Sequence, residues 1–132
     1  MDVYSNSDSL LINRIFDSDE RTTYEMKFLD LNKEEIRVSY VKKEKRYTDE
    51  GYTLYLLSEK RKECRLDTLS PELYGALDKI AKKYGVTLIN DELMIDKDSS
   101  ENNIKHYEMA NLLNCILAIN SLIRFTDIFA HN

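Results

Sequence analysis

The residues best suited to catalysis in this sequence are Glu25 and Lys27, which stand two apart on a predicted strand. A carboxylate and an ammonium at this spacing, with a further Asp, can hold Mg²⁺ and position a water, as in nucleases of the restriction-enzyme type. Asp8 and Asp17 are the upstream candidates for that Asp, and neither lies on a predicted strand. Because 33% of the chain is charged, Glu-x-Lys also arises readily by chance. A weak Mg-dependent nuclease therefore stays an alternative, and we assign no catalytic residue.

The histidines and cysteines lack the spacing of a metal or nucleophile site. The chain has two histidines, His106 and His131, and two distant cysteines, Cys64 and Cys115. A structural zinc site needs four such ligands at defined spacing. A glycine-rich phosphate loop is also absent from the sequence, which has three glycines. We expect no metal, no cofactor and two free thiols in a reducing cytosol. The roles of Cys64 and His106 stay open.

The stretch Thr48-Asp49-Glu50-Gly51 predicts a tight turn, because Asp can accept a backbone hydrogen bond two residues on and Gly tolerates positive φ. Asp49 can be read as catalytic, but turn formation is its commoner role in such a context. Aromatic rings and basic clusters flank the turn, and such side chains mark contact surfaces. We expect a binding surface made of Lys42, Lys43, Lys45, Arg46, Tyr47, Asp49, Tyr52, Tyr55, Lys60 and Arg61.

These side chains need elements that position them, and the hydrophobic periodicity of the first half predicts a helix and a meander. A short helix is expected over residues 10–16, capped by Asp8 or Ser9. Strands are expected over residues 22–29, 36–40 and 46–48, and again over 52–57 after the turn. The charged residues 58–67 show no clear pattern.

The second half of the sequence predicts two helices and a hairpin. Ser70 and Pro71 mark the start of a middle helix, and Gly85 marks its end. Asn90-Asp91 predicts a two-residue turn between strands over 86–89 and 92–95, because both residues tolerate left-handed φ.

A long C-terminal helix is expected, with Asp98 and Glu101 as capping residues. It is apolar on most sides between residues 109 and 119, which indicates a central core element or a dimer face. We therefore predict one α+β domain over residues 1–132, with frayed ends at 1–9 and 130–132. In it, the antiparallel meander and the β-hairpin pack against the long C-terminal helix and the middle helix.

The formal charge of −5 is unevenly distributed along the chain. Residues 42–83 carry eleven Lys and Arg against eight Asp and Glu, while the remainder is acidic. A basic belt between acidic ends can meet nucleic acid or an acidic partner. A solvated surface of mixed sign is the plainer interpretation, because nucleic-acid binders usually show a clearer positive excess. No signal segment and no bilayer-length apolar run is found, so we expect no membrane association.

Several short strings, taken in order, extend through most of the chain. They are Phe28-Leu29-Asp30; Ile36, Val38 and Tyr40; Thr48 to Leu54; Tyr84-Gly85-Val86; Leu88; Glu92-Leu93 onward to His106; and Leu112 to Asn120. In order and spacing they resemble the bacterial and phage domain-of-unknown-function family numbered eighteen twenty-eight. The first twenty residues are not well covered. The resemblance implies a compact α+β domain common in Firmicute genomes and prophages, with no reaction to carry over.

We therefore expect a small non-enzymatic interaction protein of a phage or mobile element, acting in the cytoplasm of a bacterial host. Its most specific form is an anti-CRISPR-like inhibitor that binds a Cas effector or another nuclease of host defence. The alternative is a nucleic-acid-binding accessory domain, or a weak nuclease, associated with restriction systems. A homodimer through the C-terminal helix is a third interpretation, and the identity of the partner stays open.

Overall fold

The computed structural model describes residues 11–63, 69–96 and 107–130, with side chains described as far as Leu122. The capping candidates Asp8, Ser9, Asp98 and Glu101, together with Cys64, His106 and His131, lie outside these residues. In chain order the elements are β1 (Ile12–Asp17), β2 (Arg21–Leu29), β3 (Glu35–Val41), β4 (Arg46–Thr48), α1 (Tyr52–Glu63), α2 (Pro71–Lys83), β5 (Thr87–Ile89), β6 (Glu92–Asp96) and α3 (Tyr107–Ala130).

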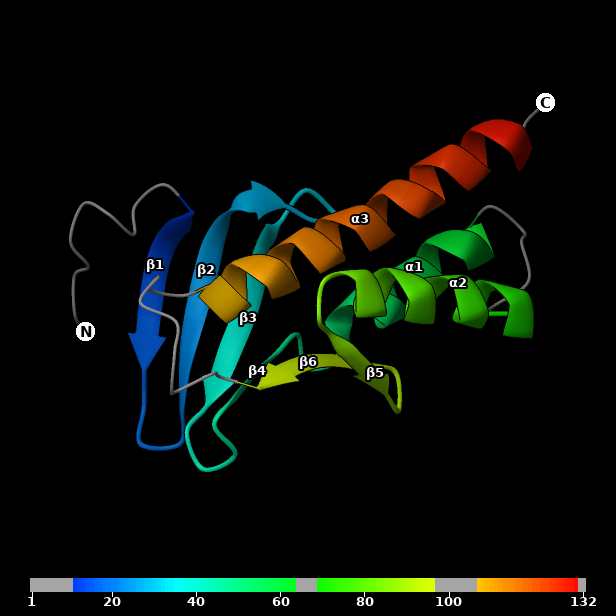
Figure 1. The fold of residues 1–132 in the computed structure, drawn as a ribbon. Coiled ribbons are helices and arrows are strands. Elements are labelled where there is room, and N and C mark those ends of the chain that lie inside the picture. The colour runs from blue at the N-terminus through cyan, green and yellow to red at the C-terminus, as the bar shows by residue number, and fades with distance from the viewer. Residues whose placement is uncertain (1–10, 64–68, 97–106, 131–132) are drawn as a thin grey trace.

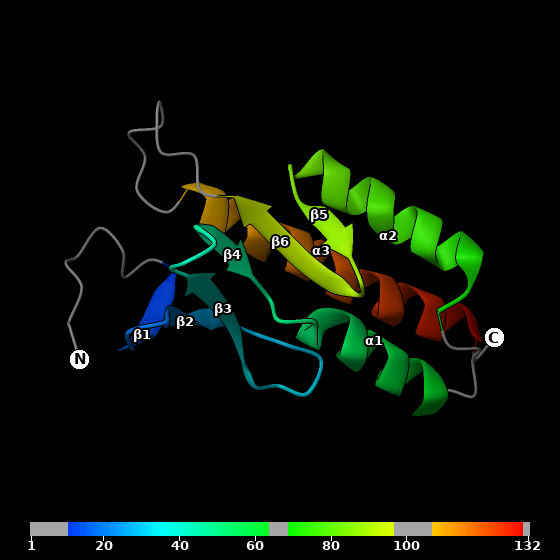
Figure 2. The same cartoon turned by 90° about the horizontal axis from the view of Figure 1, so that it is seen from below.

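The strands form one six-stranded antiparallel sheet in the order β1-β2-β3-β4-β6-β5. Hairpin β5–β6 joins the meander because β6 pairs with β4, with Thr48 opposite Met94. Figures 1 and 2 show α3 crossing the sheet, with α1 and α2 beside it. The predicted α+β class, an antiparallel sheet with a middle and a C-terminal helix, is confirmed.

One face of the sheet is the core face. Tyr24 opposes Val38 across β2 and β3, and both are buried, so the residues on either side of each point to the other face. Helix α3 packs on the core face through buried apolar residues that include Leu112, Ile116 and Ile119. Burying each such side chain stabilises the fold by about 1.5–3 kcal/mol. The apolar stretch of α3 is thus the core element that its sequence indicated.

The helix predicted over residues 10–16 is wrong, because residues 12–17 form strand β1. A register shift lies between Ile12, which opposes Met26, and Arg14, which opposes the adjacent Glu25. This bulge puts Ile12 and Ile15 on the same buried face although they are three residues apart. Apolar residues three apart are the helical signature, so the bulge imitates a helix in the sequence.

The strand predicted over residues 52–57 is also wrong, because these residues begin helix α1. Tyr and Thr favour strands in general, but this stretch packs as a helix. Its buried residues are Thr53, Leu54, Leu56 and Leu57. Of these, Leu54 and Leu57, three apart, belong to the main core cluster. The same spacing places Tyr52 and Tyr55 together on the solvent side. The helix continues through the charged residues 58–63, which had shown no clear pattern.

Other turn and cap predictions are confirmed. Ser70 is the N-cap of α2, and its hydroxyl accepts a hydrogen bond from the Leu73 N–H at 3.2 Å. Gly85 has a φ of 72° just after α2. Asn90 and Asp91 have φ values of 51° and 65° in the β5–β6 turn. Among the described residues, no helix is both long and apolar enough to span a bilayer.

Candidate functional site

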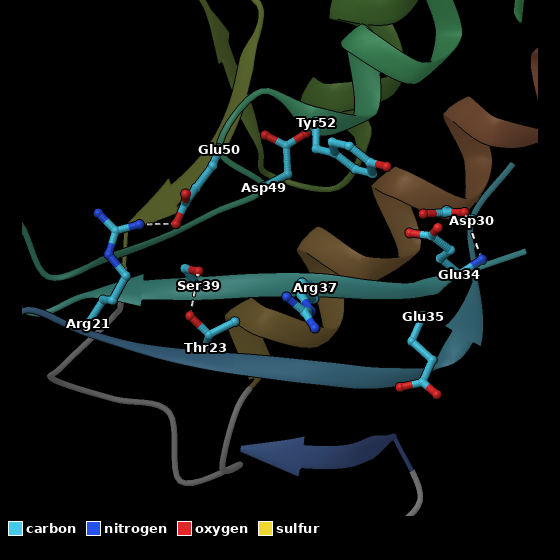
Figure 3. A pocket seen from close by; sticks show the side chains of 10 residues that line it. All are labelled: Arg21, Thr23, Asp30, Glu34, Glu35, Arg37, Ser39, Asp49, Glu50 and Tyr52. Carbon is cyan, nitrogen blue, oxygen red and sulfur yellow. Dashed lines mark hydrogen bonds and ion pairs between the residues drawn. The ribbon is translucent and has the colours of Figure 1, made fainter. Parts of the chain in front are cut away.

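The outer face of the sheet has a hollow where β3 and β4 separate. Strand β4 pairs only with residues 39–41 of β3, and the chain then turns into α1. Residues 35–38 of β3 therefore border open space rather than a neighbouring strand on that side. The hollow has a volume of about 690 Å³. Its lining residues are Arg21, Thr23, Asp30, Glu34, Glu35, Arg37, Ser39, Asp49, Glu50 and Tyr52 (Figure 3).

The wall of the hollow on the α1 side is held by Asp49. Its Oδ1 accepts hydrogen bonds from the N–H groups of Gly51 at 2.8 Å and Leu93 at 3.0 Å, and its Oδ2 accepts from Thr53 N–H at 3.0 Å. Burial raises the pKa of Asp49, while these donors and the Thr53 side chain act in the opposite direction. The predicted role of Asp49 in the turn is confirmed, and the carboxylate also anchors the first turn of α1.

The hollow carries an excess of negative charge. Five of its lining residues are carboxylates and two are guanidiniums. Both guanidiniums are already ion-paired, Arg21 with Glu50 and Arg37 with the adjacent Glu25, whose Oε2 lies 3.0 Å from Arg37 Nη2. Between the strands, the hydroxyls of Thr23 and Ser39 lie 3.1 Å apart in a hydrogen bond. An incoming positive charge would therefore meet a hollow with a net negative potential.

Asp30, Glu34 and Tyr52 gather at one end of the hollow, opposite the Arg21–Glu50 pair (Figure 3). Asp30 is 5% exposed, and its Oδ1 accepts from the N–H groups of Asn32 at 2.8 Å and Glu34 at 3.0 Å. Burial raises the pKa of the Tyr52 hydroxyl, the negative charges of Asp30 and Glu34 raise it further, and a hydrogen bond with Asn32 opposes them. Tyr52 therefore connects α1 to the β2–β3 turn.

Glu25 lies beneath arginine side chains on the outer face of the sheet, next to the hollow. Its Oε1 lies 2.9 Å from Arg14 Nε, and its carboxylate is 3% exposed. Hydrogen bonding to Glu35, together with Arg14 and Arg37, lowers the pKa of Glu25 to about 2, although burial acts to raise it. Both carboxylate oxygens are thus occupied by guanidiniums.

The residues weighed for a nuclease site are separated in the structure. In the β1–β2 pairing, Asp17 opposes Thr22 and Arg14 opposes Glu25. The two pairs are three positions apart, and side chains alternate between faces along a strand, so Asp17 and Glu25 point to opposite faces of the sheet. Asp17 Oδ1 lies 2.9 Å from Lys42 Nζ and accepts a hydrogen bond from Thr22 at 2.7 Å. Lys27 is exposed, in the irregular part of β2 between the paired positions Glu25 and Leu29. Asp8 lies outside the described residues.

The residues predicted as one binding surface fall in three places. Lys42, Lys43, Lys45 and Arg46 belong to the β3–β4 turn and the start of β4. Tyr52 and Tyr55 are exposed and stacked on α1, with ring centroids 6.0 Å apart, whereas Lys60 and Arg61 lie in its last turn. Tyr47 and Asp49 are buried, so they lie beneath the surface. Tyr52 and Asp49 are the members of this set that line the hollow.

Most of the hollow was not foreseen from the sequence. Asp30, Glu34 and Glu35 resembled ordinary polar turn residues, and Thr23, Arg37 and Ser39 resembled the solvent side of alternating strands. The available signal was Asp30 followed by Asn32-Lys33-Glu34, in which Asp is a turn former. That pattern predicts the turn but contains no information on the facing residues of α1.

Within the described ranges, no group of three or more His, Cys, Asp and Glu side chains is placed to hold a metal ion. A family model described as a domain of unknown function, DUF1828, matches residues 27–119 of the 132-residue chain. The match begins on β2 and extends into α3, so it includes most of the hollow. No curated protein matches the chain, and no solved structure matches it.

Proposed function

This chain belongs to the DUF1828 family, and on that premise we propose that it is a small, non-enzymatic protein that binds another protein through the outer face of its sheet. The observation that carries the proposal is the open hollow, with five carboxylates against two guanidiniums that are already paired. A surface of this kind complements a basic surface, because opposite potentials steer association and favour the correct register.

The specific form of the proposal is an anti-CRISPR-like inhibitor of a nuclease-based bacterial defence system. Nucleases bind phosphates through grooves lined by Lys and Arg. An acidic hollow on a small protein can occupy such a groove and exclude the nucleic acid. The resemblance to a family of bacterial and phage proteins supports the same direction, and a cytoplasmic Cas effector or another defence nuclease is the partner class that we propose.

Inhibition assays can test this proposal. The purified protein is added to a panel of Cas effectors and restriction nucleases from Firmicute hosts, and DNA binding and cleavage are measured at several salt concentrations. We expect stoichiometric inhibition of at least one nuclease, weakening as salt rises. A triple variant, Glu34→Gln with Glu35→Gln and Glu50→Gln, should inhibit at least tenfold less well. Failure to inhibit or bind any member of the panel would reject the proposal.

A second candidate function is nucleic-acid binding through the basic residues of the β3–β4 turn. The observation that favours it is that Lys42, Lys43, Lys45 and Arg46 are adjacent at one turn, with Lys43 and Lys45 exposed. A mobility-shift titration separates the two functions. Binding to phosphates weakens steeply with salt and should be reduced by Lys43→Gln with Lys45→Gln, whereas protein-mediated inhibition should respond to the triple carboxylate variant.

A further inference from the structure

We propose that residues 35–37 of β3 form an open strand edge, and that an extended segment of the partner protein adds to the sheet there as a further strand inside the hollow. The segment carries basic side chains that alternate with small ones. This inference rests on the proposed function, because it describes how the chain of the partner enters the hollow.

The backbone N–H and C=O groups of β3 point alternately towards β2 and towards the hollow. Near one end of the strand the Lys42 N–H donates to the Glu20 carbonyl at 3.0 Å, and near the other end the Glu34 carbonyl accepts from the Asp30 N–H at 2.7 Å. Both bonds lie on the β2 side, so even-numbered residues face β2 throughout. Odd-numbered residues, Arg37 among them, therefore present their backbone groups to the opposite side.

On that opposite side the neighbouring strand is too short to cover β3. Strand β4 pairs with β3 only as far as Ser39, and within the described residues no hydrogen bond joins the backbone of Glu35 or Arg37 to β4, to the turn after it or to α1. Unpaired groups along a strand edge are a template for an added strand.

The open edge borders a space that can hold an extended segment. The volume of the hollow, about 690 Å³, falls within the range of about 300–1,000 Å³ that is usual for binding pockets. Asp49 and Tyr52 lie across this space from β3 (Figure 3). A strand laid against Glu35 and Arg37 would therefore run between β3 and the start of α1.

The core side of this edge selects a small side chain. In an added antiparallel strand, the residue opposite Ile36 points to the core face, because paired residues lie on the same face of a sheet. A cavity of only about 20 Å³ lies there, lined by Ile36, Thr53 and Asn120 among others. This is room for about one water-sized group, so the residue opposite Ile36 should be no larger than alanine.

The outer side of the edge selects basic side chains. The residues of the added strand that lie opposite Glu35 and Arg37 point into the hollow, where five carboxylates face two guanidiniums that are already paired. Charged side chains on an open edge oppose the addition of an apolar strand, and like charges across a strand pair repel. A segment with alternating basic and small residues satisfies both faces.

The direct test is an NMR titration of the full chain with the peptide Ac-Arg-Ala-Arg-Ala-Arg-NH2 and two N-methylated derivatives of equal charge. In the added strand the arginine N–H groups face β3 and the alanine N–H groups point away. N-methylation of the arginines should weaken binding at least about tenfold, and N-methylation of the alanines at most about threefold. Bound peptide should also slow hydrogen exchange at the amides of Glu35 and Arg37. Equal weakening of the two derivatives, or no protection of these amides, would overturn the proposal.

A pair of variants tests the edge from the side of the protein. Arg37→Pro and Arg37→Ala both remove the ion pair with Glu25, but the proline alone removes the N–H that faces the hollow. Proline is compatible with a strand edge whose N–H is unpaired. We expect Arg37→Pro to bind the peptide at least about fivefold more weakly than Arg37→Ala, and equal affinities would contradict the strand addition. Amide spectra establish that each variant is folded, and if Arg37→Pro is not, the N-methylated peptides decide.

The contribution of charge has its own matched control. Glu34→Gln, which removes a carboxylate from the hollow, should weaken peptide binding about two- to threefold. Glu72→Gln removes an equal charge from the exposed first turn of α2, outside the hollow, and should leave the affinity unchanged. If both variants bound equally weakly, the selection of basic side chains by the hollow would be wrong.

A second measurement separates this inference from the proposed function. The two Arg37 variants are compared with the wild type in the nuclease inhibition assay. If a nuclease is inhibited equally by Arg37→Pro and Arg37→Ala, the protein is an inhibitor but strand addition at β3 is not its mode of binding. If the peptides behave as expected and no nuclease is inhibited, the strand edge is a binding site and the proposed function fails.

Discussion

Asp49 and Leu93, which are 44 positions apart in the sequence, are joined by two hydrogen bonds, one donated by each residue. The Leu93 N–H donates to Asp49 Oδ1 at 3.0 Å, and the Asp49 N–H donates to the Leu93 carbonyl at 3.1 Å. The same carboxylate accepts a hydrogen bond from the N–H of Thr53 in the first turn of α1. One side chain therefore joins the start of α1 to β6 and sets the wall of the acidic hollow.

This relationship predicts that Asp49 is a stability determinant. We expect Asp49→Ala to lower the free energy of unfolding by about 2–4 kcal/mol, because a lost cap costs about 1 kcal/mol and each buried N–H without an acceptor costs about 1–3 kcal/mol. Asp49→Asn keeps the acceptor at Oδ1, so its cost should be about 1 kcal/mol. Urea denaturation measures both, and an equal loss for the two variants would contradict the role of Oδ1.

Two glycine substitutions should change the stability of the protein in opposite directions. Gly51 has a φ of 83°, so Gly51→Ala should destabilise the protein by about 1–2 kcal/mol through backbone strain. Gly75 lies inside α2, where an added Cβ meets nothing within 4 Å. Gly75→Ala should stabilise by about 0.5–1 kcal/mol, because alanine favours the helix. Thermal unfolding of the pair tests this sign change, and stabilisation by both substitutions would refute it.

Acid sensitivity should arise in part from Glu25. Its pKa is lowered to about 2 in the folded protein from an ordinary value of 4.5. A carboxyl with a depressed folded pKa contributes stability above its unfolded pKa and loses it as the pH falls. We expect this contribution to be complete above pH 4.5 and to disappear between pH 4.5 and about 2.

Denaturation curves between pH 7 and pH 2.5 measure the effect. Glu25→Gln should be less stable than the wild type at pH 7, and the difference should shrink as the pH falls. A difference that stayed constant over this range would show that the ion pairs with Arg14 and Arg37 do not carry it. Glu72→Gln provides the control, with little change at either pH.

Cys115 should be chemically inert in the folded protein. Burial, and then the negative charge of Asp49, raise the pKa of its thiol to about 12. Because the thiolate is the reactive species, iodoacetamide at pH 8 should leave Cys115 unmodified until the protein is unfolded in urea. The measurement is made by mass spectrometry on Cys64→Ser, so that Cys115 is the remaining thiol. Rapid modification under native conditions would contradict its burial.

Local signals in the sequence predicted much of the fold. Alternation located β2 and β3, Ser70 and Pro71 located the start of α2, and Asn90-Asp91 located the β5–β6 turn. Each of these depends on a preference of one or two residues for a backbone conformation. The two elements whose type was predicted wrongly are β1 and α1, where local preferences favoured a different structure from the one that forms. A bulge at Asn13 imitated helical spacing, and Tyr and Thr in the first turn of α1 imitated a strand.

The candidate site was predicted less well, because its residues come from β2, β3, two turns and α1. The sequence singled out Tyr52 and Asp49 through their types, but it contained no signal that Asp30 and Glu34 would lie opposite Tyr52. The basic residues that stood out in sequence proved to be divided between the β3–β4 turn and the end of α1.

By itself, the sequence determined the turn at Asp49–Gly51, because an Asx hydrogen bond and a glycine at positive φ are properties of neighbouring residues. Only the tertiary structure decided that a helix follows this turn. Burial of Leu54 and Leu57 against the core and the bond from Leu93 to Asp49 outweigh the local preference for a strand. The hollow exists for the same reason, since a helix at this position leaves residues 35–38 of β3 without a neighbouring strand on the β4 side.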